Sequence, residues 1–276
     1  MRDVSFGQYY PATSFAHKCD PRTKIILLIV YIAAIFTAKN FYGLGVCALA
    51  FIVMTACSKV PFKTVFKTVK GIAFLLVFTA ALNLFFYSGG TPLTVGGVTL
   101  KWGMIRISKE GMIYTVFLAS RLLLLVVGSS LLTLTTTPVS LTDGIESLLS
   151  PLKYIRFPVR ELALIMSIAL RFIPILSDET GRIMNAQKAR GADFETGGLV
   201  KKVKAVVPVL IPLLISSFRR ADELGDAMDA RCYSGGKTRT KYKKLAFGWR
   251  DWIAFVFGVA LLTGVILFRS CFGGVV

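Results

Sequence analysis

The sequence has few of the residues that build catalytic and metal sites. It holds a single histidine, His17, which is expected in a solvated loop, and only 15 acidic residues out of 276. Its five cysteines form an odd set without metal-ligand spacing, at positions 19, 47, 57, 232 and 271. Two of them, Cys47 and Cys57, lie in an apolar segment and are expected to pack there. These shortages predict a protein that is not an enzyme, holds no metal ion and needs no cofactor of its own.

Acidic residues and histidine are also missing from the longest apolar stretches. The chain is 54% hydrophobic and 17% charged, with a mean hydropathy of +0.66, which indicates an integral membrane protein. A helix that crosses the bilayer needs about 20 predominantly apolar residues, and five segments come close to that length: 24–38, 41–57, 71–87, 112–134 and 252–269. None of the five contains Asp, Glu or His, so a proton relay of the kind found in secondary transporters lacks its residues.

One full charge, Arg121, is predicted deep inside a span, within the sequence LASRLLLLVV. Burial of a charge in lipid is costly, so this side chain must face protein or reach the interface. A contact with a partner protein and hydrogen bonds to the backbone carbonyls of neighbouring helices are equally consistent with the sequence.

The basic residues predict the orientation of the chain in the membrane. The net charge is +18; residues 135–250 hold 19 of the 33 Lys and Arg and 11 of the 15 Asp and Glu, a mixed block of net +8. The 58–70 loop adds four lysines. Because cytoplasmic loops carry the excess of Lys and Arg, the N-terminus, the 58–70 loop and the 135–250 block are expected in the cytoplasm, and the 88–111 loop and the C-terminus outside. The basic excess therefore indicates topology and contact with anionic membrane lipids, not nucleic-acid binding.

The expected fold is an all-α integral membrane protein with about five transmembrane helices and a cytoplasmic region of three amphipathic or long helices. Residues 1–134 would form an N-terminal membrane region with four spans, 135–250 the cytoplasmic region and 251–276 the C-terminal span. In the cytoplasmic region, apolar residues at helical spacing predict one amphipathic helix: Leu141, Ile145, Leu148, Leu149 and Leu152.

Two further apolar runs, 162–176 and 205–218, are 15 and 14 residues long and contain proline. Both are short for a bilayer. They predict two long, bent helices that lie half embedded against other protein; two additional spans, seven in all, are the alternative.

The two long helices are predicted to end in matched tips. Aligned on Arg190 and Arg231, which are 41 positions apart, both sequences have alanine one and four residues earlier and a branched apolar residue seven residues earlier. Alanines keep a helix slim, and an arginine in the last turn complements the helix dipole by about 0.3–1 kcal/mol. Its five donors suit the carboxylates or carbonyls of a partner. The residues of the two tips are Ala189, Arg190 and Gly191, and Ala230, Arg231 and Cys232.

Such tips are suited to docking into grooves of another protein. The plainer alternative, in which each arginine caps its own helix and faces water, is favoured for a single Ala-Arg-Gly sequence, but two matched tips favour docking. Gly191 is the residue expected just after a helix end, where φ is positive. Cysteine disfavours that conformation, so the second helix is expected either to be strained at Cys232 or to continue to Gly235-Gly236, and the two grooves are expected to differ.

No nucleotide site accompanies the tips. The stretch SGGKTRT at 234–240 resembles the end of a phosphate-binding P-loop, but Arg231 stands where that motif needs a glycine, five residues before Gly236. ATP hydrolysis is therefore expected in other subunits.

The paired tips and their surroundings resemble the transmembrane T component of energy-coupling factor (ECF) transporters, the EcfT/CbiQ family. The likeness lies in DPRTK at 20–24, PLKYIRFPVRELALIMSIALRFIP at 151–174, AQKARG at 186–191, RRADELGDAMDARCY at 219–233 and a last span after a basic loop. It is strongest over 138–236. The family pattern has glycine where this chain has Cys232, which predicts a different shape for the second contact.

The resemblance implies a non-catalytic subunit of an ABC importer for vitamin or metal-ion uptake, located in the bacterial cell membrane. The tips would insert into two cytoplasmic ATPase subunits, with a non-identical pair favoured, and Arg190 and Arg231 would be the coupling arginines. The cytoplasmic helices would grip a small substrate-binding membrane subunit. Their apolar faces supply the candidate residues for this grip: Leu141, Ile145, Leu148, Leu149, Leu152, Ile165, Val207 and Leu210.

Two other classes of protein are the alternatives to this one. A self-sufficient permease or channel would transport without ATPases, and the missing intramembrane acids count against it. A membrane-embedded enzyme would need a polar catalytic cluster that the sequence lacks. The choice of transported substrate would lie in the partner membrane subunit.

Overall fold

The computed structural model of the chain describes residues 9–86, 94–95, 98–99, 101–102, 105–106, 109–155, 157–194, 198–233, 235 and 245–272. These residues form an all-α membrane protein, as predicted from the sequence. They divide into two compact units: a membrane unit of residues 9–145 and 245–272, and a long-helix unit of residues 146–235.

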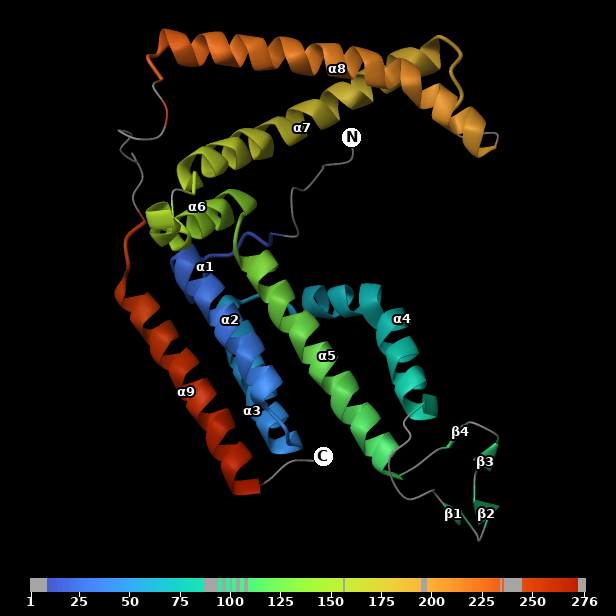
Figure 1. Ribbon diagram of the computed structural model, residues 1–276, viewed down its shortest axis with the longest axis vertical. Helices are drawn as coiled ribbons and strands as arrows, with labels where there is room; N and C mark the ends of the chain where they lie inside the picture. The colour runs from blue at the N-terminus through green and yellow to red at the C-terminus, as the bar shows by residue number, and fades with distance from the viewer. Residues whose placement is uncertain are drawn as a thin grey trace. The chain divides into compact units, whose positions relative to one another are not determined.

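The membrane unit is built from α1 (Phe15–Lys18), α2 (Pro21–Thr37), α3 (Phe41–Ser58), α4 (Phe62–Phe86), α5 (Lys109–Thr135) and α9 (Trp249–Phe272). Figure 1 shows α2, α3, α5 and α9 running side by side, with α4 next to α5. Among the described residues, three helices are long and apolar enough to cross a membrane: α3, α5 over Gly111–Thr135, and α9 over Trp249–Cys271. The other two predicted spans are shorter, 17 residues in α2 and Val69–Asn83 within α4.

Most of the charged segment 58–70 is not the predicted loop but the first part of α4. Lys59 adopts a left-handed conformation (φ 53°) directly after α3 and ends that helix. α4 then begins at Phe62, one residue after Pro61, because proline favours the first turn of a helix. Three lysines of this segment therefore lie on a helix: Lys63, Lys67 and Lys70.

A core of apolar side chains holds the membrane unit together. It joins α2, α3, α4, α5 and α9 in one cluster that includes Cys47 and Val265, both fully buried. A glycine lets two of these helices approach closely, since a Cβ at Gly128 of α5 would lie 2.2 Å from a ring carbon of Tyr31 on α2. Cys47 packs in the core as predicted, but Cys57 is exposed.

Two aspartates fix the start of α2 against the start of α9. The side chain of Asp20 accepts a hydrogen bond from the backbone N–H of Arg22 (2.9 Å), and Pro21 is the first residue of α2. The backbone N–H of Asp20 donates to the carboxylate of Asp251, in the first turn of α9 (2.8 Å). Nothing in the sequence pattern singles out Asp251, whose buried carboxylate joins segments 231 residues apart.

His17 lies in the short helix α1 and not in a solvated loop, so that prediction was wrong. Its Nδ1 is 2.7 Å from the hydroxyl oxygen of Ser14, and its Nε2 is 2.9 Å from the carbonyl oxygen of Tyr10. Partial burial lowers the pKa of His17. The ring is therefore mainly neutral at neutral pH and ties together the segment that precedes α2.

Hydrogen bonds to a neighbouring helix end account for Arg121 on α5. Its Nη2 donates to the carbonyl oxygens of Ala38 (2.5 Å) and Phe36 (3.5 Å), at the end of α2. The guanidinium also lies over the ring of Phe117, 5.0 Å from its centroid. Of the two roles that the sequence left open, the structure supports the one in which Arg121 binds backbone carbonyls.

Two short hairpins between α4 and α5 were not predicted. Thr94–Val95 (β1) pairs antiparallel with Val98–Thr99 (β2), and Lys101–Trp102 (β3) pairs antiparallel with Ile105–Arg106 (β4). Each ladder is two residues long, so the all-α class is unchanged.

The predicted amphipathic helix is shorter than expected at its C-terminal end. α6 spans Pro138–Leu148, and the 3-10 helix η1 follows over Ser150–Ile155. The break has a physical cause, because Pro151 has no backbone N–H to donate to the carbonyl four residues earlier, as a continuing α-helix requires. α6 packs against α2 at Gly144, where an added Cβ would lie 3.0 Å from the side chain of Pro21.

The long-helix unit consists mainly of α7 (Val159–Ala189) and α8 (Leu199–Ala230), which are 31 and 32 residues long. Neither is among the described helices that are long and apolar enough to cross a membrane. Pro174 lies inside α7, and Pro208 and Pro212 lie inside α8, where Figure 1 shows a bend. Two long helices were predicted here in preference to two further spans, and the structure agrees.

Candidate functional site

The first predicted tip ends α7 with a left-handed glycine. Gly191 has a φ of +87° and follows Arg190. The backbone N–H of Gly191 donates to the carbonyl of Lys188 (3.0 Å), and that of Ala192 donates to the carbonyl of Gln187 (3.0 Å). This pair of hydrogen bonds is the Schellman arrangement, which satisfies carbonyl groups at the C-terminus of a helix.

The second tip repeats this arrangement of the backbone 41 residues later. The N–H of Cys232 donates to the carbonyl of Asp229 (2.9 Å), and that of Tyr233 to the carbonyl of Met228 (3.0 Å). Cys232 is left-handed, with a φ of +54°, and α8 ends at Ala230. Of the two expectations for this position, strain at Cys232 is confirmed and a continuation of the helix to Gly235 is wrong.

We expect Cys232→Gly to stabilise the second tip, because a left-handed residue with a Cβ costs about 1 kcal/mol. Hydrogen exchange at the amide of Tyr233, which closes the cap, should slow by about fivefold in the variant, as a change of about 1 kcal/mol in local opening requires. Cys232→Ser retains the Cβ and should leave the exchange rate unchanged. Faster exchange in Cys232→Gly than in the parent chain would contradict the strain at this position.

Both tips present their arginines to the surroundings. Neither guanidinium has a hydrogen-bond or ion-pair partner in the part of the chain that the structure describes. The carbonyls that close each cap accept from backbone N–H groups instead, so the described residues leave the donors of both arginines unused. The side chains around the tips are small and exposed along with the arginines: Ala186, Ala189, Arg190, Ala227, Ala230 and Arg231.

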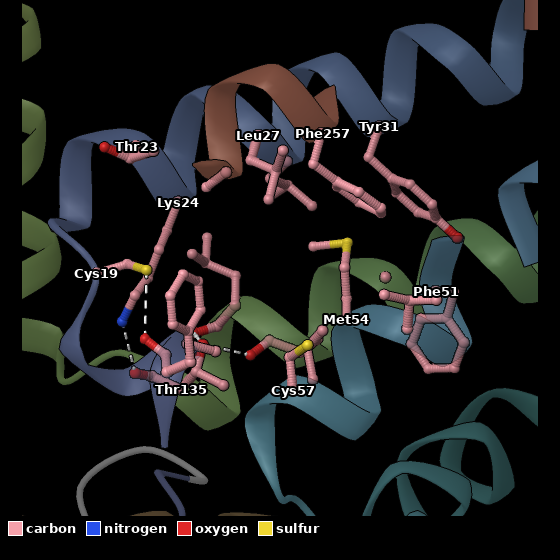
Figure 2. A pocket seen from close by; sticks show the side chains of 18 of the residues that line it. Cys19, Thr23, Lys24, Leu27, Tyr31, Phe51, Met54, Cys57, Thr135 and Phe257 are labelled. Carbon is pink, nitrogen blue, oxygen red and sulfur yellow. Dashed lines mark hydrogen bonds between the residues drawn. The ribbon is translucent and has the colours of Figure 1, made fainter. Parts of the chain in front are cut away.

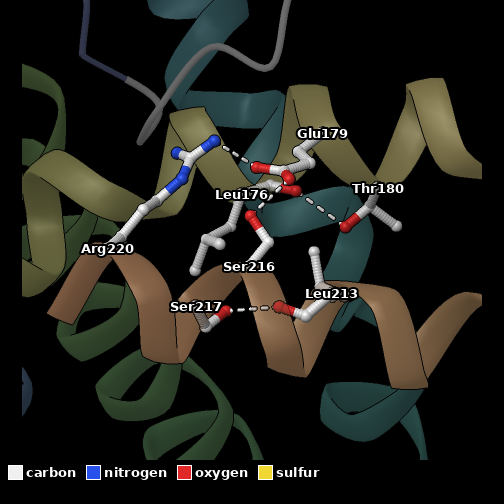
Figure 3. A network of polar contacts seen from close by, with 7 residues as sticks. All are labelled: Leu176, Glu179, Thr180, Leu213, Ser216, Ser217 and Arg220. Atoms are coloured by element: carbon white, nitrogen blue, oxygen red, sulfur yellow. Dashed lines mark hydrogen bonds and ion pairs between the residues drawn. The ribbon is translucent and has the colours of Figure 1, made fainter. Parts of the chain in front are cut away.

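A polar network joins α7 and α8 where they pack together (Figure 3). The hydroxyl of Ser216 on α8 donates to a carboxylate oxygen of Glu179 on α7 (2.5 Å), and the guanidinium of Arg220 forms a hydrogen-bonded ion pair with the same carboxylate. Gln187 Nε2 also donates to the carbonyl of Pro208 (3.5 Å). Because Gln187 follows Glu179 while Pro208 precedes Ser216, the two helices are antiparallel. We name Glu179, Ser216 and Arg220 the Glu179 pin.

The Glu179 pin lies midway between the two tips. Eleven residues separate Glu179 from Arg190, and eleven separate Arg220 from Arg231; at a rise of about 1.5 Å per residue, each tip lies about 16 Å from the pin. Because the helices are antiparallel, the tips point to opposite sides and lie about 33 Å apart along the helices. We call the two helix segments between the pin and the tips, residues 179–190 and 220–231, the arms. The prolines of α7 and α8 lie outside both, so each arm is an unbroken helix.

Sequence reasoning missed the Glu179 pin. The available signal was the four-residue spacing of Ser216 and Arg220, which places both on one face of α8. Their partner on α7 depends on how the two helices pair, and a single sequence does not reveal that register.

The residues predicted to contact a membrane partner are spread over α6, α7 and α8. Four are exposed, Ile145, Ile165, Val207 and Leu210, and three are half-buried, Leu141, Leu148 and Leu149. The side chain of Leu152 and most of the P-loop-like stretch at 234–240 lie outside the described residues. On α8, the exposed apolar side chains form a continuous stripe at helical spacing: Val200, Val203, Val207, Leu210, Leu214 and Phe218.

The chain matches a known protein family over most of its length. The sequence profile of the CbiQ family, described as cobalt transport protein, matches residues 12–242. The chain is 47% identical over 273 residues to a protein of Clostridium kluyveri and 46% identical over 272 residues to one of Ruminiclostridium cellulolyticum, with 99% of each chain covered in both cases. It is 40% identical over 270 residues to a protein of Bacillus subtilis, covering 98% of this chain and 100% of the relative. All three relatives are named energy-coupling factor transporter transmembrane protein EcfT.

These matches confirm the family that the paired tips and the surrounding motifs indicated. The apolar helices of the membrane unit agree with a transporter component in the bacterial cell membrane. The chain belongs to the EcfT/CbiQ family, the transmembrane energy-coupling components of ECF transporters.

Proposed function

We propose that this chain transmits the ATP-driven motion of two cytoplasmic ATPase subunits to a separate, small membrane subunit that binds the transported vitamin or metal ion. The observation that carries the proposal is the pair of matched tips. Each consists of an exposed arginine on a slim helix end with the same backbone cap. The tips lie on opposite sides of one ionic contact, which suits two separate grooves, one on each ATPase.

The geometry of α7 and α8 provides a path for the motion. If the ATPases close on binding ATP, each groove carries its tip as the rigid end of a proline-free arm. The Glu179 pin holds the arms at one crossing point, so that displaced tips rotate the helices about the pin. The exposed apolar faces of the helices, with Ile165 on α7 and Val207 and Leu210 on α8, would then reposition the substrate-binding subunit.

The charges around the two tips support a pair of non-identical ATPases. Arg182 and Lys188 precede the first tip, whereas the aligned positions before the second tip hold Glu223 and Asp229. All four side chains are exposed. Grooves that are complementary in charge to these surfaces must differ, because like charges placed against one another disfavour binding.

This function requires both tips to lie in the cytoplasm. The distribution of Lys and Arg supports that orientation, with the N-terminus inside and the C-terminus outside. Five spans, formed by the three long apolar helices and the shorter α2 and α4, would place the termini on opposite sides. Residues 1–134 and 251–276 would then form the membrane regions on either side of the cytoplasmic region 135–250.

Copurification tests the proposed function against a self-sufficient permease. The tagged chain, extracted in mild detergent, should bring with it two ATPase subunits and a small membrane protein, and uptake by this assembly in vesicles should require ATP. A permease predicts uptake by the chain alone. Uptake without ATPases, together with no ATPase among the copurified proteins, would overturn the proposal.

Removing the charge of Glu179 should uncouple ATP hydrolysis from uptake. Glu179→Gln replaces a half-buried, hydrogen-bonded ion pair with a neutral contact, which weakens the pin by about 1 kcal/mol. We expect the ATPases to remain bound, since the tips are intact, while the uptake per ATP hydrolysed falls on the order of fivefold. Asp178→Asn removes an exposed charge from the neighbouring position and is the matched control. If the uptake per ATP hydrolysed is unchanged in Glu179→Gln, the pin does not position the tips.

A further inference from the structure

The membrane unit contains an apolar pocket that the coupling function does not use (Figure 2). The cavity has a volume of about 220 Å³, and its walls come from α1, α2, α3, α5 and α9. An apolar cavity of about 150 Å³ in another protein binds benzene, so this cavity has room for an apolar group of at least that size. The side chains that line it are predominantly apolar, among them Leu27, Tyr31, Met54, Leu131 and Phe257.

The pocket lies where α3 and α9 separate. At one end of this antiparallel pair the helices are joined, because Asn40, at the start of α3, donates through Nδ2 to the carbonyl of Phe268 on α9 (3.4 Å). Toward the other end, Val53 on α3 and Ile253 on α9 both line the pocket, and both are exposed, at 41% and 47%. The pocket therefore opens sideways, between two helices that are each long and apolar enough to cross a membrane.

One cation lies at the polar end of the pocket. The ammonium of Lys24 donates to the carbonyl oxygens of His17 (3.3 Å) and Thr135 (3.1 Å). An ammonium has three donors, and Lys24 forms no ion pair with a carboxylate among the described residues. The neighbouring thiol of Cys19 donates to the carbonyl of Phe15 (3.3 Å), and burial raises its pKa, so it stays neutral. One donor of Lys24 thus remains for a ligand, in a surrounding that also includes the carboxylates of Asp20 and Asp251.

We propose that this pocket binds part of one acyl chain of an anionic phospholipid, with Lys24 holding the phosphate of the headgroup. The apolar walls take the chain, the sideways opening admits it from the bilayer, and the ammonium lies at one end, as a headgroup lies at the end of its chain. A soluble metabolite needs several polar partners in its site, and this pocket offers few.

The surroundings of the pocket agree with a lipid ligand. In the proposed orientation, the end that holds Lys24 faces the cytoplasm, and the cytoplasmic leaflet is the one rich in anionic lipids. The inference concerns the membrane unit alone and goes beyond the proposed coupling function, since it needs no ATPase and no substrate-binding subunit.

Photolabelling of the full chain in phosphatidylcholine nanodiscs tests the pocket. Trace phosphatidylglycerol with a diazirine midway along one acyl chain should label residues that line the cavity, such as Met54 and Phe257, as located by peptide mass spectrometry. Ala254→Phe fills the cavity and Cys57→Trp fills its mouth, and each should reduce this labelling severalfold. Leu49→Trp adds bulk to an exposed position on α3 outside the pocket and should leave it unchanged. Labelling that is spread over the outer helix faces and is insensitive to both filling variants would overturn the proposal.

A second comparison tests the role of Lys24. The same diazirine chain on phosphatidylcholine should label the pocket about fivefold less than on phosphatidylglycerol, which is the effect of one lysine near anionic lipid. Lys24→Met should abolish this preference, and Lys24→Arg should retain it. Equal labelling by the two lipids in the parent chain would overturn the headgroup assignment. Because the chain is labelled without ATPases, failure here is distinct from failure of the coupling proposal.

Discussion

Reversing the charge of both tip arginines, Arg190→Glu together with Arg231→Glu, should release the ATPase subunits while the chain still inserts and folds. Both side chains are exposed and have no partner among the described residues, so the change removes no described internal contact. It would instead leave the groups that receive the arginine donors facing a carboxylate. Losing a charged pair inside a groove costs about 2–5 kcal/mol, so binding at each tip should weaken at least about 30-fold. The measurement is the amount of ATPase that copurifies with the tagged chain.

Single reversals and a matched control separate the two grooves. Arg190→Glu alone should weaken attachment at one ATPase, and Arg231→Glu alone at the other. Arg171→Glu makes the same change in charge at another exposed position of α7, 19 residues before Arg190, and should retain both ATPases. Full ATPase binding and unaltered uptake in the double variant would refute the role of the tips.

Gly128→Ala should destabilise the membrane unit by about 2–4 kcal/mol. The new Cβ would lie 2.2 and 2.8 Å from two ring carbons of Tyr31, which is only 3% exposed. The ring must move, which costs about 1–3 kcal/mol of overpacking. The hydrogen bond from the Tyr31 hydroxyl to the carbonyl of Leu124 (3.4 Å) is lost with it, at about 1 kcal/mol. The fall in the thermal midpoint of the purified chain in detergent measures this effect.

Gly45→Ala is the matched control for that experiment. Gly45 lies within α3, and a Cβ there would meet nothing within 4 Å. Because alanine favours a helix over glycine by up to about 1 kcal/mol, the control should be neutral or slightly stabilising. The two glycine-to-alanine changes should therefore have opposite signs. A neutral Gly128→Ala would mean that α2 and α5 do not pack as closely as the structure shows.

The helices and both tips could be predicted from the sequence because their signals are local. Long apolar runs predict the membrane helices. The matching residues around Arg190 and Arg231, 41 positions apart, predict two helix ends, and these share the same backbone hydrogen bonds. Cys232 was recognised as a conflict between residue type and conformation. In the structure, the helix cap is retained and Cys232 adopts the left-handed conformation that cysteine disfavours.

The features that the sequence did not reveal depend on contacts between distant segments. Asp251 meets Asp20 across 231 positions, and Glu179 meets Arg220 across 41. No periodicity in one sequence links such positions. The lysines of the 58–70 segment predict a loop, but charge indicates exposure to water rather than the absence of a helix, and α4 begins within this segment, at Phe62. Cys57 was assigned to the core from its apolar neighbours, although one face of a membrane helix can border a pocket or lipid.

The position of the ionic contact between the long helices also sets how far one tip moves relative to the other. Glu179 and Arg220 each lie eleven residues from the arginine of their own helix. The two helix segments that extend from the contact therefore have the same length. A rotation of the helices about this contact then moves both tips by equal distances, whichever tip is displaced first. In the proposed function, the two ATPases would therefore have to move their tips by equal distances, even if the two subunits differ. Removing one helical turn between Glu179 and Arg190, or between Arg220 and Arg231, would make these distances unequal.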